Sequence, residues 1–172
     1  LPWGESIANT TFTGNTSGFI IAKPDYFSSR QSLSSSCPTG KGLWNLKLTT
    51  DWYAFETKWS LHKYNNDERI AYGPPESYNY EDTTTYTGNL CLPIGQYYIR
   101  WYDISSDGIC CTYGEGSWIV TVNGKVVLKN NPNDDSFKQR DFPFEVVVST
   151  SDDNDDDVIT GIFLRRTLFE NI

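Results

Sequence analysis

Hydrophobic and polar residues alternate along most of this chain, and no stretch shows the stripe of an amphipathic helix. Trp, Leu, Tyr and Ile alternate with polar or charged residues in residues 44–48, 59–61 and 97–101. A period of two places one set of side chains on the buried face of a β-strand. Similar runs predict strands over residues 18–22, 118–122, 126–128, 142–148 and 158–169. Asn123-Gly124, between two of these runs, predicts a tight hairpin.

These short segments, separated by Gly, Pro, Asn and Asp, predict an all-β fold. We expect a jelly-roll β-sandwich of about nine or ten antiparallel strands. The chain has 172 residues, with no internal repeat and no domain-sized linker. Residues 1–172 are therefore expected to form a single β-sandwich domain. His62, the only histidine, falls on the polar phase of its strand and is expected to be exposed.

The charge balance argues against two classes of partner. The chain carries 14 Lys and Arg against 22 Asp and Glu, a formal net charge of -8. Such a surface repels nucleic-acid phosphates and lacks a basic patch for anionic membranes. No apolar run approaches the ~20 residues of a membrane span, so membrane insertion is not expected. The absence of Met indicates that a signal peptide has been removed.

Four cysteines in an acidic chain rich in Asn, Ser, Thr and Tyr predict a secreted or cell-surface protein with disulfide bonds. Asn9 and Asn15 begin possible N-glycosylation sequons, which agree with that location. Three connectivities are possible among Cys37, Cys91, Cys110 and Cys111. A bond between neighbouring cysteines is strained and uncommon. We therefore expect one doublet cysteine to pair with Cys91 and the other with Cys37, in either combination.

An acidic loop offers oxygen atoms in a pattern that suits a cation. Residues 103–108 read D-I-S-S-D-G, which places Asp103 and Asp107 on alternating positions before a glycine that permits a sharp turn. Calcium prefers such oxygen ligands. Position twelve of this loop is Gly114 rather than Glu, so the loop is not an EF-hand. The alternative is an ordinary turn with solvated carboxylates.

The segment D-W-Y-A-F-E-T-K-W, residues 51–59, adds two further acids between two predicted strands. Asp51 and Glu56 lie at strand ends, from which they can point into the same loop region as Asp103 and Asp107. Otherwise this segment is a polar connection whose Glu56 faces water. A cation shared by the two segments is our preferred interpretation.

Taken together, four motifs resemble a family of secreted β-sandwich modules common in marine microalgae and bacteria. They are the segment of residues 51–59, C-L-P at 91–93, Y-D at 102–103 and S-D-G-I-C-C-T-Y-G-E-G-S-W at 106–118. The resemblance covers residues 43–128, about half the chain. It implies a calcium-stabilised jelly roll, shaped like galactose-binding-like domains, with Asp51, Glu56, Asp103 and Asp107 as ligands. Where the family has another cysteine the chain has Gln96-Tyr97, which implies that Cys37 supplies the missing partner.

Tyrosines between residues 72 and 88 form a candidate ligand platform. Tyr72, Tyr78, Tyr80 and Tyr86 could stack on sugar rings. The alternative is that these rings cap the edge of the sandwich. The acidic run at residues 152–157 has no glycine at the turn position, so we interpret it as a solvated loop rather than a second cation site.

The function predicted from these features is a secreted, calcium-binding recognition module for carbohydrate or cell-wall material. One alternative is a structural or adhesive extracellular protein without a small-molecule site. Another is a polysaccharide-cleaving enzyme, either a glycoside hydrolase or a lyase. We assign no catalytic residue, because the best-placed acids lie in the metal-like loops and no nucleophile motif accompanies His62.

Overall fold

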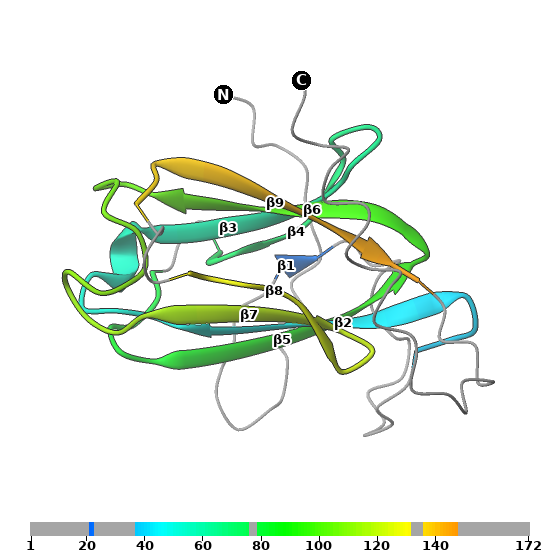
Figure 1. Cartoon of the computed structure of the whole chain (residues 1–172), viewed down its shortest axis with the longest axis horizontal. Coiled ribbons are helices and arrows are strands. Elements are labelled where there is room, and N and C mark those ends of the chain that lie inside the picture. Colours follow the sequence, from blue (N-terminus) through cyan, green and yellow to red (C-terminus); the bar gives the residue numbers. More distant parts are fainter. Residues whose placement is uncertain (1–20, 23–36, 76–78, 132–135, 148–172) are drawn as a thin grey trace.

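The computed structural model describes residues 21–22, 37–75, 79–131 and 136–147, which form two antiparallel sheets packed face to face (Figure 1). One sheet has the order β1-β4-β3-β6-β9 and the other the order β5-β2-β7-β8. The strands are β1 (Ile21–Ala22), β2 (Lys41–Thr49), β3 (Thr57–Lys63), β4 (Arg69–Gly73), β5 (Thr85–Pro93), β6 (Gly95–Asp103), β7 (Ser117–Val122), β8 (Lys125–Lys129) and β9 (Gln139–Val146). The predicted all-β sandwich is confirmed.

Among the described residues, the number of strands longer than two residues is smaller than the nine or ten predicted. Eight strands have five residues or more, not nine or ten, and β1 adds only two residues. The strand predicted over residues 158–169 lies outside the described residues. Between β2 and β9 the chain crosses from one sheet to the other at every connection except β3–β4 and β7–β8, as in jelly rolls. Asn123 and Gly124 have φ of 50° and 78° and form the predicted hairpin turn.

Four buried tryptophans hold the two sheets together. Trp44 of β2 meets Trp59 of β3, with ring centroids 5.9 Å apart. Trp101 of β6 meets Trp118 of β7 at 5.1 Å. Each pair joins one sheet to the other, and such aromatic pairs add about 0.5–1.5 kcal/mol beyond the burial of their area. The strand phase that the alternation predicted for these residues is confirmed.

The pairing of β3 with β6 decides where the functional loops begin. Trp59 lies opposite Trp101, and two residues along Thr57 lies opposite Asp103. Alternate residues of β6 face the core, so the series that includes Ile99 and Trp101 ends with Asp103. The carboxylate of Asp103 therefore lies at one end of the sandwich interior.

The disulfide pairing differs from the prediction. The bonds are Cys37–Cys91 and Cys110–Cys111. Cys91 pairs with Leu43 at the start of β2, whereas the 103–116 loop lies beyond the other end of that strand. Six residues of strand span about 20 Å, and bonded cysteines need Cα atoms within about 7 Å. A bond from Cys91 to the doublet is therefore geometrically excluded.

His62 is buried, so the prediction of an exposed histidine is wrong. The outer face of β3 is covered because the ring of Tyr98 stacks on the imidazole, with centroids 4.9 Å apart. Nε2 lies 2.9 Å from Ser60 Oγ, and Nδ1 lies 3.0 Å from the carbonyl oxygen of Asp67. Because that carbonyl can only accept, Nδ1 carries the proton of the neutral ring. Burial lowers the pKa of His62 and outweighs the opposing bond to Asp67.

We expect stability to fall when His62 is forced to take up a proton. A lowered folded-state pKa contributes stability that is complete above about pH 6.5 and is lost as the pH falls through the folded pKa. His62→Gln should flatten this part of the melting temperature against pH, measured at constant calcium. NMR titration of the single imidazole should give a pKa below 6.5, and a pKa at or above that value would contradict the expectation.

Candidate metal centre

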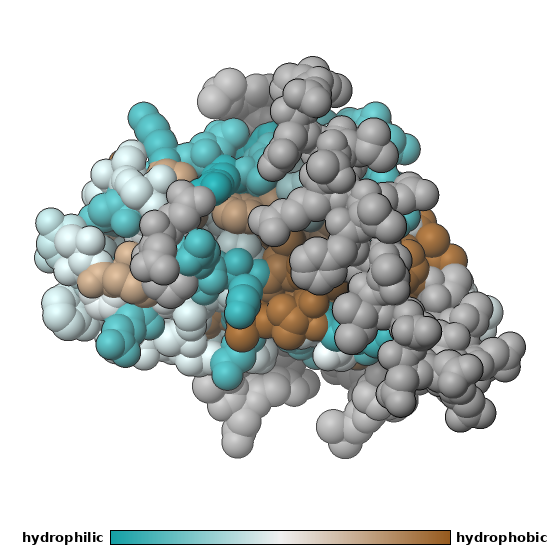
Figure 2. Space-filling model, viewed as in Figure 1, coloured by the Kyte–Doolittle hydropathy of each residue, from teal (hydrophilic) through white to brown (hydrophobic). Residues whose placement is uncertain are grey.

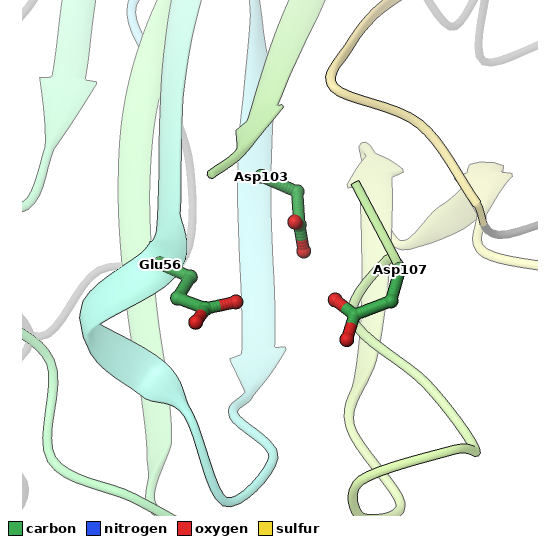
Figure 3. A group of neighbouring side chains, drawn as sticks. All are labelled: Glu56, Asp103 and Asp107. Atoms are coloured by element: carbon green, nitrogen blue, oxygen red, sulfur yellow. The ribbon is translucent and has the colours of Figure 1, made fainter. Parts of the chain in front are cut away.

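Three carboxylates from separate segments converge at one end of the sandwich. Glu56, Asp103 and Asp107 each place an oxygen within 4.8 Å of the others. Figure 3 shows Glu56 at the end of a helical turn, Asp103 at the end of a strand and Asp107 in the loop that follows, with their carboxylates directed toward a common space. The sequence prediction that acids near residue 56 and in the 103–107 loop meet is confirmed for these three residues.

Glu56 is positioned by a short 3-10 helix, η2 (Ala54–Glu56), which two other acids stabilise. The backbone N–H of Tyr53 donates to Asp51 Oδ1 at 2.9 Å, and that of Ala54 donates to Asp82 Oδ1 at 3.0 Å. Asp51, a predicted ligand, is thus engaged in fixing the turn and is not one of the three converging carboxylates. The role of Asp82 was missed, although Asp and Asn commonly accept bonds from nearby backbone groups in turns.

The 103–116 loop is held by contacts on both sides of Asp107. The backbone N–H of Ser106 donates to Asp103 Oδ1 at 2.6 Å, and the hydroxyl of Ser136 donates to the Ser106 carbonyl at 2.7 Å. Ile109 is fully buried in the core. Gly116 lies so close to it that an added Cβ would be 1.9 Å from the Ile109 carbonyl oxygen. The loop is consequently a packed part of the sandwich.

The Cys110–Cys111 bond closes a tight turn within this loop. The N–H of Cys111 donates to the Gly114 carbonyl at 3.0 Å, and Cys111 has a φ of 103°. The turn brings Tyr113 back toward the first acidic segment, where its carbonyl accepts from Trp52 N–H at 3.1 Å. The vicinal bond thus helps to join the loop that carries Asp107 to the segment that carries Glu56.

The electrostatic environment of the three carboxylates is unfavourable without a cation. Asp103 is 2 % exposed. Burial, together with the charges of Asp107 and Glu56, raises its pKa to about 6 against the lowering effect of the Ser106 N–H bond. Burial also raises the pKa of Asp51. No described Lys, Arg or His forms an ion pair with the three carboxylates. This concentration of negative charge can hold a metal ion, and the carboxylate donors suit a hard cation.

Two of the four tyrosines of the predicted platform are buried. Tyr80 and Tyr86 belong to the core, where Tyr80 Oη accepts from Trp59 Nε1 at 2.8 Å and Tyr86 Oη accepts from the N–H of Glu81 at 2.7 Å. The guanidinium of Arg69 lies 4.4 Å above the ring of Tyr72. The prediction is wrong for Tyr80 and Tyr86, because Tyr80 is bonded to Trp59 in the core and the Tyr86 ring packs on that of Tyr80. Tyr78, Asn9, Asn15 and the acidic run at 152–157 lie outside the described residues.

A hollow of about 480 Å³ lies on the outer face of the five-stranded sheet. Its lining residues are Tyr64, Asp67, Tyr98, Arg100, Asp141 and Pro143. Arg100 makes a two-bonded ion pair with Asp141, at 2.6 and 2.7 Å. None of the three converging carboxylates lines this hollow, and the one cation among its described lining residues is already paired.

The chain matches no protein-family model, curated protein or solved structure in the comparisons. Among the described residues no helix has the length and apolar character to cross a bilayer. The two disulfides fit an oxidising compartment.

We expect Gly116→Ala to disrupt the 103–116 loop. The new methyl group would collide with the Ile109 backbone, and overpacking of this kind costs about 3 kcal/mol of unfolding free energy. Gly40→Ala is the control. Gly40 has a φ of 81°, and an added Cβ would have no atom within 4 Å, so only about 1 kcal/mol of backbone strain is expected. Urea unfolding measures both values, and equal losses would contradict the close contact at Gly116.

Proposed function

We propose that this protein is an extracellular recognition module whose β-sandwich holds a calcium ion between Glu56, Asp103 and Asp107. The convergence of these carboxylates carries the proposal. Buried or half-buried acids that lie close together with no described cationic side chain paired to them favour binding of a positive charge, and a divalent ion supplies it. The ion would link η2, the end of β6 and the loop that follows, and would act as a cross-link between the two acidic segments.

Calcium fits this donor set better than other common ions. The three side chains offer only oxygen, whereas zinc sites use mainly Cys and His. Calcium is bound by oxygens at about 2.3–2.6 Å, and carboxylate oxygens that lie within 4.8 Å of one another can share one such ion. Calcium also tolerates irregular coordination, which suits donors from separate loops.

The proposed ligand class is carbohydrate or cell-wall material. Support comes from exposed aromatic side chains near the metal centre, namely Trp52, Tyr53, Phe55 and Tyr113. Such rings offer flat apolar faces with polar edges. The sequence motifs that resemble secreted β-sandwich modules favour the same class, and the disulfides favour an extracellular location.

Calcium should stabilise the fold through Glu56 and Asp107. At a free concentration of 100 times Kd the gain is about 2.7 kcal/mol, or roughly 5–10 °C in melting temperature for a chain of this size. Glu56→Gln and Asp107→Asn should each weaken calcium binding at least tenfold in titration calorimetry. Glu115→Gln, an exposed change in the same loop with the same loss of charge, should leave it unchanged. A melting temperature unaffected by chelator in the parent protein rejects the proposal.

Asp103→Asn should have opposite effects with and without calcium. In chelator the substitution removes a buried negative charge that faces two others, so the melting temperature should rise above that of the parent protein. Adding calcium should not raise the melting temperature of the variant, because the most buried proposed ligand has lost its charge. Differential scanning calorimetry in both buffers tests this reversal. A variant that is less stable than the parent in chelator would show that repulsion among these acids is not significant.

A further inference from the structure

An exposed cluster of aromatic rings lies beside the metal centre. We call Tyr53, Phe55 and Tyr113 the aromatic rim. The Tyr53 ring centroid is 6.3 Å from that of Phe55 and 5.4 Å from that of Tyr113, both in edge-to-face geometry. The three side chains are 43–48 % exposed, and neighbouring Trp52 is 60 % exposed. The end of the molecule at the left of Figure 2 is mostly pale, which marks intermediate hydropathy.

The aromatic rim and the proposed calcium ligands share the same two segments. Tyr53 and Phe55 precede Glu56 in and beside η2, and Tyr113 follows Asp107 in the 103–116 loop. The bond from Trp52 N–H to the Tyr113 carbonyl joins these segments. Gly114 adds to this contact, because its Cα hydrogens face Asp51 where a Cβ would lie 3.1 Å from the Asp51 Cβ. A ligand resting on the rim would therefore contact the two segments that carry the proposed calcium ligands.

The backbone that carries two of the exposed rings is held in place. The Tyr53 backbone is fixed by Asp51, and the Tyr113 turn is closed by the Cys110–Cys111 bond. Four other tryptophans of the chain are at most 2 % exposed, so the exposure of the rim aromatics contrasts with the burial of aromatic side chains in the core. A rigid, clustered set of exposed rings is a common feature of ligand surfaces, because little conformational freedom is lost on binding.

The charge around the rim selects among possible ligands. Asp51, Asp82 and Glu115 lie in the same two segments or in contact with them, in addition to the three converging carboxylates. Anionic lipid headgroups and sulfated or phosphorylated ligands would be repelled by this excess of acids. A neutral sugar ring can place its C–H face on an aromatic ring and still present hydroxyl oxygens. Those oxygens are ligands that calcium accepts.

The coordination of the ion leaves room for such hydroxyls. Calcium takes about 6–8 oxygens, whereas three carboxylates supply one or two each. One oxygen of Asp103 already accepts the Ser106 N–H. Glu56 and Asp107 are half-buried, so the side of the site that they line is open to solvent.

We propose that a neutral glycan binds across the aromatic rim, with one sugar ring stacked on Tyr53, Phe55 or Tyr113 and two neighbouring hydroxyl oxygens completing the calcium shell beside Glu56 and Asp107. This inference rests on the proposed function and assigns its ligand surface and the direct role of the ion. The hollow at Tyr64 is the competing surface, and sugar binding there would not depend on calcium.

The full chain would be tested on immobilised neutral glycans ending in galactose, mannose or glucose, with a sulfated glycan and phosphatidylserine-containing vesicles for comparison. We expect binding to neutral glycans in calcium and none in chelator. The triple variant with Tyr53→Ala, Phe55→Ala and Tyr113→Ala should weaken binding at least tenfold, while the calcium Kd stays within about twofold. The three single variants identify the ring on which the sugar stacks. Tyr64→Ala is the matched control, since Tyr64 is 43 % exposed and also meets a neighbouring ring edge-on, and it should bind as the parent does.

The outcomes separate this inference from the calcium proposal. Glycan binding that survives all three rim substitutions but is lost with Tyr64→Ala overturns the inference and leaves the calcium site standing. Absence of any neutral glycan binding, or stronger binding to the sulfated glycan or the vesicles, also overturns it. If the parent protein binds calcium poorly and binds glycans equally well in chelator, both proposals fail.

Discussion

The register between β3 and β6 is the constraint on which the rest of the structure depends. It sets Trp59 opposite Trp101 and Thr57 opposite Asp103, so the residues that hold the sheets together and those that form the acidic centre are fixed by one ladder. A shift of one residue would move every side chain of β6 to the other face of the sheet. Asp103 would then point to solvent and Trp101 would leave the core. Core packing therefore stabilises the register, and the register positions the acid.

Burial of Asp103 has a cost that core packing must offset. Its carboxylate lies in line with apolar side chains and faces Glu56 and Asp107, so it opposes folding in the absence of a cation. A tightly packed sandwich can tolerate this unfavourable charge, because the aromatic pairs Trp44–Trp59 and Trp101–Trp118 hold the sheets together without any contribution from Asp103. In the proposed function the same group gives the loop its affinity for calcium. Stability and binding are thus linked through one side chain.

The two disulfides act at opposite ends of the sandwich. Cys37–Cys91 attaches the segment before β2 to β5, whereas Cys110–Cys111 shapes the turn that leads from Asp107 to Tyr113. Only the second bond lies near the metal centre. One end of the sandwich therefore has a local cross-link within a loop, and the other end has a cross-link between residues distant in sequence.

The sequence by itself determined the β-sandwich, the inward phase of the tryptophans, the Asn123-Gly124 hairpin and the approach of Glu56, Asp103 and Asp107. These features follow from period-two alternation, local turn chemistry and the placement of acids at strand ends. Only the tertiary structure decided the disulfide pairing, the burial of His62, Tyr80 and Tyr86, and the use of Asp51 and Asp82 to fix η2. Each of these depends on which distant side chain covers a given face or loop. Alternation reports that a residue faces away from the core, but it does not report whether a ring such as Tyr98 covers that residue from outside.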